Sequence, residues 1–274
     1  MTLVVSGLAR HFGGVQAVRD VSFTLHPGEC VALIGPNGAG KSTTFACIAG
    51  QLQPHAGSVV WNGARINALD APERMRRGVA RTFQVAQVFE ALTVLQNLQL
   101  LMQIPRGLNA YDDLDRCAKP LAQALLEQVD LAAWGSTLAR HLPYGAKKRL
   151  ELAMALAGLQ DCGLGVPRQR PHDAQLLLLD EPAAGLAASE RQTLMALVHS
   201  LTRRDRGRTP MAVLYTEHNM DAVFGVADRA LVLMDGVLVA DGTPDAIARD
   251  PQVRERYLGR GWNLQEHLME GRDA

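Results

Sequence analysis

A nine-residue stretch, GPNGAGKST at residues 35–43, constrains the fold of this chain more than any other feature. It fits the pattern G-x-x-x-x-G-K-[ST] and lies between a strand-like run, CVALI, and a helix-like run, TTFACIA. Glycines let backbone N–H groups wrap a phosphate, a lysine supplies positive charge to it, and a serine can ligate Mg²⁺. The stretch therefore predicts a loop that holds nucleotide phosphates through Gly35, Pro36, Asn37, Gly38, Ala39, Gly40, Lys41, Ser42 and Thr43.

The stretch LLLLDEP supplies acidic groups that a phosphate site needs. Asp180 ends an apolar run of strand length, where it can hold Mg²⁺ through water or the Ser42 hydroxyl, and Glu181 can orient or deprotonate an attacking water. Paired acids that end a strand are often only a solvated edge, but the phosphate loop favours the catalytic interpretation. Gln84 and His218 each follow another strand-like segment. Gln84 can there reach metal and water, and His218 can contact the γ-phosphate. Taken singly, such a glutamine is usually a surface amide and such a histidine a satisfied polar residue.

A glycine turn precedes a helix in HLPYGAKKRLELAMALAG, residues 141–158. The apolar spacing predicts a helix that starts near Lys147 and buries one face. Gly145 and the cations of the first turn form a natural place to meet an anion, because free N–H groups and the helix dipole point that way. On these residues alone, a solvated turn that binds nothing is the more common outcome.

The order of strand-like and helix-like segments predicts an α/β fold. The first sixty residues are rich in short strands, and residues 93–158 are helical in pattern. The unbroken apolar runs LLLLD and MAVLYT suit central strands that are covered on both faces. Two short helices are expected to close the fold near residue 259. The turn and cap signals are hairpin dipeptides at Asn62-Gly63 and Asp235-Gly236 and N-caps at Thr93, Thr243 and Asp250.

Composition narrows the class of protein. The 28 basic residues balance 28 acidic ones, and 5% of residues are aromatic, which argues against a chain held on nucleic acid by charge and base stacking. Four scattered cysteines, Cys30, Cys47, Cys117 and Cys162, fit no metal spacing and are read as reduced thiols. No uncharged apolar run approaches the ~18 residues of a spanning helix, and the N-terminus lacks an export signal. We therefore expect a protein that neither crosses a membrane nor is exported.

The order of these motifs resembles that of ATP-binding subunits of ABC transporters. The phosphate loop, the strand-end glutamine, the glycine turn, LLLLDEP and the EH after a strand span nearly the whole chain. FGGVQAVRDVSF, RTFQ, LTVLQNL, DEPAAGL and DGTPDAIARDPQVRERYLG are similar to the subfamily that energises uptake of branched-chain amino acids and related polar solutes. The resemblance implies an α/β P-loop NTPase (RecA-like) core with an antiparallel β-subdomain and an inserted helical subdomain. It places one ABC domain at residues 1–259, the helical subdomain at about 88–158 and a tail at 260–274.

The resemblance also implies site roles. ATP and Mg²⁺ would be the cofactors, and Phe12 would stack on adenine unless it is an ordinary core residue. Glu181, His218 and Gln84 would be catalytic, and Ser42, Gln84 and Asp180 would meet the metal. In this family two such domains pair head to tail, so Gly145 would contact the ATP of the partner domain.

Partners follow from the same resemblance. They would be two membrane permease subunits, a second ATP-binding subunit that is identical or a sister chain, and indirectly an extracytoplasmic solute-binding protein, with no nucleic acid. The chain would lie peripherally on the cytoplasmic face of the inner membrane. Val88 and Phe89 would lie near the groove for a permease coupling helix, although a place in the helical-subdomain core explains them equally well.

The sequence departs from the family pattern in the groups offered across the dimer. The usual Leu-Ser-Gly-Gly-Gln turn is Leu-Pro-Tyr-Gly-Ala at residues 142–146, and Ala187 replaces the usual Asp or Asn. An insertion at about 160–175 has no assigned role. A nucleotide-gated regulatory module with weak hydrolysis therefore stays open as an alternative. A soluble ABC ATPase acting on nucleic acid is less suited, because one phosphate loop and no long coiled coil are present.

Overall fold

The computed structural model describes residues 2–103, 111–159, 175–203 and 210–258. Four strands form an antiparallel sheet in the order β2-β1-β4-β5. A hairpin of positive-φ residues, Asn62 at 51° and Gly63 at 78°, joins the last two strands, which confirms the predicted turn. The bounds are β1 (Leu3–Phe12), β2 (Val15–Leu25), β4 (Ala56–Trp61) and β5 (Ala64–Arg65).

A second sheet of six strands carries the phosphate loop, in the order β10-β9-β3-β8-β7-β6. Its strands pair in parallel except for the β9–β10 hairpin, which turns at Asp235-Gly236 as predicted. LLLLD and AVLYT form the adjacent strands β7 and β8, both buried throughout. The bounds are β3 (Cys30–Ile34), β6 (Val79–Arg81), β7 (Leu176–Asp180), β8 (Ala212–Thr216), β9 (Arg229–Met234) and β10 (Val237–Gly242).

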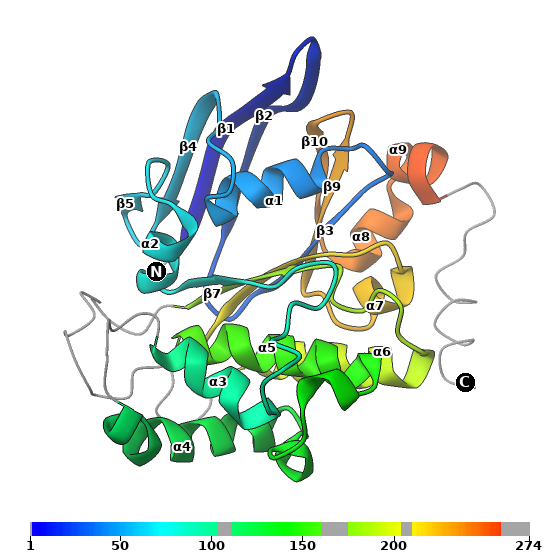
Figure 1. Ribbon diagram of the computed structural model, residues 1–274. Coiled ribbons are helices and arrows are strands. Elements are labelled where there is room, and N and C mark those ends of the chain that lie inside the picture. The colour runs from blue at the N-terminus through cyan, green and yellow to red at the C-terminus, as the bar shows by residue number, and fades with distance from the viewer. Residues whose placement is uncertain (1, 104–110, 160–174, 204–209, 259–274) are drawn as a thin grey trace.

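Two hydrophobic cores cover the central sheet, one on each face. Alternate residues of β3 illustrate the division, because Val31 and Leu33 join the core that includes the antiparallel sheet, whereas Ala32 and Ile34 join the core that includes the long helices. Helix α1 (Lys41–Ala49) lies between the two sheets (Figure 1). On the opposite side of the central sheet lie α3 (Val94–Gln103), α4 (Tyr111–Gln128), α5 (Tyr144–Leu159) and α6 (Ala188–Ser200). Coverage on both faces explains why these strands are continuous apolar runs rather than alternating ones.

Helices α3 (Val94–Gln103), α4 (Tyr111–Gln128) and α5 (Tyr144–Leu159) pack on one another. Thr93 caps α3 as predicted, since its hydroxyl accepts from the Gln96 N–H at 3.2 Å. The predicted start of α5 near Lys147 was wrong by about one turn. The Pro143 carbonyl already accepts from the Lys147 N–H at 3.0 Å, and Gly145 is not among the positive-φ glycines. Tyr144 and Gly145 therefore belong to the helix, and Pro143 directly precedes it.

Short helices complete the structure. Thr243 and Asp250 cap α8 and α9 as expected, accepting from Ala246 and Val253. Among the described residues, no helix is both long and apolar enough to cross a bilayer. The subdomain division near residues 88–158 stays a prediction, and the expected tail and nearly all of the insertion fall outside the described ranges. The remaining bounds are α2 (Ala71–Arg76), η2 (Ala132–Trp134), η3 (Ala139–His141), α6 (Ala188–Ser200), α7 (Met220–Phe224), α8 (Pro244–Arg249), α9 (Pro251–Val253) and η4 (Arg254–Leu258).

Candidate functional site

The phosphate loop runs from the end of β3 to the start of α1. Gly35 has φ 144° and Gly40 has φ 99°, conformations that other residues rarely adopt. A side chain would also collide with neighbouring backbone, since a Cβ would lie 2.0 Å from the Leu233 carbonyl oxygen at Gly35 and 2.2 Å from that of Ala17 at Gly40. Both glycines are therefore required by close packing. The loop leads into the N-terminus of α1, where free N–H groups and the helix dipole favour an anion.

Lys41 lies in this loop with its side chain folded over the loop backbone. Its Nζ donates to the carbonyl oxygens of Gly35 at 2.6 Å and Pro36 at 2.9 Å. Burial lowers the pKa of Lys41, while the carboxylates of Glu181 and Asp180 act in the opposite direction. The ammonium is thus held beside the loop, within electrostatic reach of Asp180 at the end of β7 and of Glu181 directly after it. Ser42, the next residue, is exposed.

Glu181 brings together the three residues predicted to be catalytic. Its Oε1 lies 2.6 Å from Nε2 of His218, and its Oε2 accepts from Nε2 of Gln84 at 2.9 Å. The backbone of Glu181 has φ 46°, and its N–H donates to the Thr216 hydroxyl at 3.0 Å. Elements far apart in the chain thus converge on one carboxylate, an arrangement suited to orienting a water molecule.

Asp180, directly before this carboxylate, is held from two sides. Arg81 donates to its Oδ2 at 2.8 Å and Thr216 to its Oδ1 at 2.9 Å. Arg81 was missed as a site residue. The RTFQ motif placed it beside Gln84, but nothing in the motif indicated that a guanidinium at the end of β6 would reach the end of β7.

The oxygen atoms available as metal ligands at this site fit Mg²⁺. The Asp180 carboxylate, the Gln84 side-chain oxygen and the Ser42 hydroxyl are oxygen ligands of the kind that Mg²⁺ prefers. A carboxylate has about four lone-pair positions, and Asp180 uses two of them for Arg81 and Thr216. The residues predicted to meet the metal therefore retain acceptor capacity. Their roles as ligands stay predictions.

Glu217 is a further residue that sequence reasoning missed. It is buried, and its carboxylate accepts from the backbone N–H of Ala183 at 3.0 Å and of His218 at 3.1 Å. Burial raises the pKa of Glu217, and the backbone N–H bonds oppose that rise. The residue ties the segment after Glu181 to the segment that carries His218. The only signal in the sequence was its place in the EH pair.

Phe12 is not a core residue. It ends β1 with 47% of its surface exposed, and the Arg10 guanidinium lies 5.0 Å from its ring centre. This exposure excludes the alternative of an ordinary core Phe and leaves aromatic surface free. Its stacking on adenine stays a prediction.

Gly145 lies in the first turn of α5 and is buried against α6 of its own chain. A Cβ at this position would lie 2.6 Å from Oε1 of Glu190. Lys147, next along the turn, forms an ion pair with Glu90 at 2.7 Å. The helix therefore has a glycine where it meets its neighbour, and one of its first cations is already paired.

Comparison with known families agrees with this geometry. The ABC transporter family model matches residues 18–163, more than half of the chain. The chain belongs to the ABC transporter family. A model described as a branched-chain amino acid ATP-binding cassette transporter matches residues 237–262, which follow β9. This ABC chain is accordingly a nucleotide-binding ATPase subunit, as its motifs predicted.

Proteins of similar sequence align with nearly the full length of this chain. The high-affinity branched-chain amino acid transport ATP-binding protein BraF of Pseudomonas aeruginosa is 37% identical over 268 residues, 94% of this chain and 97% of that protein. LivG of Escherichia coli, with the same description, is 35% identical over 271 residues, 94% and 97% of the two chains. The lipopolysaccharide export system ATP-binding protein LptB of Escherichia coli is 34% identical over 263 residues, 96% and 99%.

Solved structures show the same fold. An ATP-binding cassette of an ABC transporter in its ADP conformation is 27% identical, with a TM-score of 0.75 over 95% of this chain and all of that one. A nucleotide-free cassette is 25% identical with the same TM-score and coverage. The predicted P-loop NTPase fold is thus confirmed.

Proposed function

We propose that this ABC ATPase energises the uptake of branched-chain amino acids, or of a related small polar solute, by hydrolysing ATP beneath a membrane permease. The observation that carries the proposal is the match of residues 237–262 to the branched-chain amino acid cassette model, together with the names of BraF and LivG. The match to LptB supports a second candidate, an ATPase of lipid export. Selectivity for the solute would belong to the permease and to an extracytoplasmic solute-binding protein.

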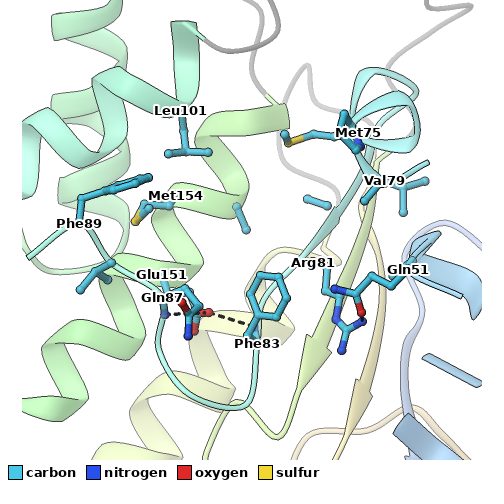
Figure 2. A pocket seen from close by; sticks show the side chains of 16 residues that line it. Gln51, Met75, Val79, Arg81, Phe83, Gln87, Phe89, Leu101, Glu151 and Met154 are labelled. Atoms are coloured by element: carbon cyan, nitrogen blue, oxygen red, sulfur yellow. Dashed lines mark hydrogen bonds between the residues drawn. The ribbon is translucent and has the colours of Figure 1, made fainter. Parts of the chain in front are cut away.

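A groove beside the candidate site is suited to binding a segment of the permease. It has a volume of about 400 Å³ and a largely apolar lining that includes Phe83, Val88, Phe89, Leu101 and Met154 (Figure 2). Phe89 is 45% exposed, so helical-subdomain core does not account for it, whereas Val88 is half-buried against the core. An apolar groove of this kind fits a short amphipathic helix from the cytoplasmic side of a permease subunit. The chain would thus lie peripherally on the cytoplasmic face of the inner membrane.

A second ATP-binding subunit, identical or a sister chain, would complete each ATP site. The first N–H groups of a helix have no partner within that helix, and in α5 these belong to Tyr144, Gly145 and Ala146. They would meet the γ-phosphate of ATP held with Mg²⁺ by the partner domain. One solved bacterial ABC cassette of the same fold, 23% identical with a TM-score of 0.69, is described as dimeric.

Transport assays in the native cell test the proposal. The chromosomal gene is deleted and restored either as wild type or as Glu181→Gln, and uptake of radiolabelled leucine, isoleucine and valine is measured. Loss of uptake in the deletion, restored by wild type but not by Glu181→Gln, supports import. Unchanged uptake of all three amino acids, with lipopolysaccharide export impaired instead, would favour the second candidate.

A further inference from the structure

Two oppositely charged side chains of α5 lie in the interior one turn apart. Lys148 is 3% exposed and Glu151 is 5% exposed. Taking such groups out of water costs several kcal/mol each unless they are well paired. Buried charged groups are expected to have hydrogen-bond partners close by.

Both side chains hydrogen-bond to the backbone of residues 83–87, the loop that carries Gln84. We call these four hydrogen bonds the grip. Glu151 accepts from the backbone N–H groups of Phe83 at 2.9 Å and Gln87 at 3.3 Å, at the two ends of residues 83–87 (Figure 2). Lys148 donates from Nζ to the carbonyl oxygens of Gln84 at 2.5 Å and Phe83 at 3.4 Å. One helix thus satisfies both donors and acceptors of a loop that has no secondary structure of its own.

The loop held in this way reaches the candidate site. Lys148 fixes the carbonyl of Gln84, and the side chain of the same glutamine donates to Glu181 at 2.9 Å. The same contacts border the apolar groove, because Phe83, Gln87 and Glu151 all line it. Helix α5 thus contacts the backbone of the same residue whose side-chain amide meets Glu181.

We propose that Lys148 and Glu151 are positioning residues that hold loop 83–87 so that the Gln84 side chain meets Glu181. The inference rests on the role proposed for Gln84. Burial raises the pKa of Glu151 and lowers that of Lys148, with attraction between them acting against both shifts.

Steady-state ATPase kinetics and ATP binding of the full-length chain with Mg²⁺ test the grip. Lys148→Met and Glu151→Leu should each lower kcat about tenfold or more while the Kd for ATP stays within about twofold, because the phosphate loop is untouched. Glu151→Gln keeps an accepting oxygen and should retain most of the activity. Arg149→Met is the matched control, since Arg149 on the same helix pairs at 2.9 Å with Asp130, whose side chain is 93% exposed.

A double-mutant cycle decides whether the grip acts through Gln84. In a Gln84→Ala background, Lys148→Met should lower kcat by less than about twofold, because the group that it positions is gone. Full additivity, or a parallel loss of ATP affinity, would overturn the inference. If one variant does not fold, the other carries the test. Gln84→Ala that turns over like wild type would overturn the proposed role of Gln84 itself, whereas a slow Gln84→Ala with active Lys148→Met and Glu151→Leu overturns only the grip.

Discussion

Nε2 of His218 lies 2.6 Å from Oε1 of Glu181, across the adjacent ends of β7 and β8. At this distance a protonated Nε2 donates a hydrogen bond to the carboxylate. His218 is 41% exposed in its side chain and Glu181 is 17% exposed, so the histidine forms the outer side of the contact. The contact holds the carboxylate in one orientation from the side opposite Gln84.

His218→Ala should lower kcat while leaving ATP binding near its wild-type level. Removal of the imidazole leaves one oxygen of Glu181 without its partner and removes a group that can contact the γ-phosphate. A well-positioned acid–base group such as Glu181 raises the reaction rate about 10²–10⁴-fold, and part of that gain should be lost. Single-turnover hydrolysis and equilibrium binding of ATP measure the two effects separately. His199→Ala is a suitable control, because His199 faces Asp228 on the exposed surface at 3.4 Å. Hydrolysis at the wild-type rate would contradict a catalytic role for His218.

Glu181→Gln should bind ATP and fail to hydrolyse it. The amide keeps the size of the side chain but cannot accept a proton from water, and Lys41 and the phosphate loop are unchanged. Gel filtration with ATP should therefore show accumulation of a closed dimer. Lys41→Ala supplies the contrasting variant, which should lose ATP binding itself. A turnover rate of Glu181→Gln within about threefold of wild type, under 1 kcal/mol of barrier, would exclude the water-activating role.

Local patterns predicted the parts of this site, but not how distant parts meet. Gly35 to Thr43 and the pair Asp180-Glu181 are readable because spacing along the chain specifies their chemistry. The bond from Gln84 to Glu181 joins residues 97 positions apart, and only the parallel pairing of β6 with β7 brings them together. Lys148 was read with its neighbours as part of a charged first turn, since its partners are backbone carbonyls that no side-chain pattern reveals. The same lack of side-chain signal hid the role of Arg74.

Arg74→Met should destabilise the fold more than a surface substitution on the same helix. Arg74 is 1% exposed, and its guanidinium donates to the carbonyl oxygens of Cys47 at 2.8 Å and Ile48 at 2.6 Å in the last turn of α1. Two further bonds reach Leu69 and Asn67. Loss of one partner from a buried charged network costs about 3–5 kcal/mol, and the orphaned carbonyls stay buried. Urea unfolding measures the change, with exposed Arg76→Met as the control, and a difference below about 1 kcal/mol would contradict this role.

The effect of Gly145→Ala on the free energy of unfolding should depend on the residue at position 190. In the wild-type chain the new Cβ would lie 2.6 Å from Oε1 of Glu190, so that carboxylate must move away and lose its contact with the Ala187 N–H at 3.3 Å. A lost cap costs about 1 kcal/mol, which opposes the similar gain of Ala over Gly in a helix. In a Glu190→Ala background only the gain remains. Urea unfolding of the four variants should therefore give a coupling of about 1 kcal/mol between the two positions, with Gly145→Ala more favourable when Glu190 is absent. Additive effects would show that Glu190 does not confine Gly145, and that the glycine is not required by packing within its own chain.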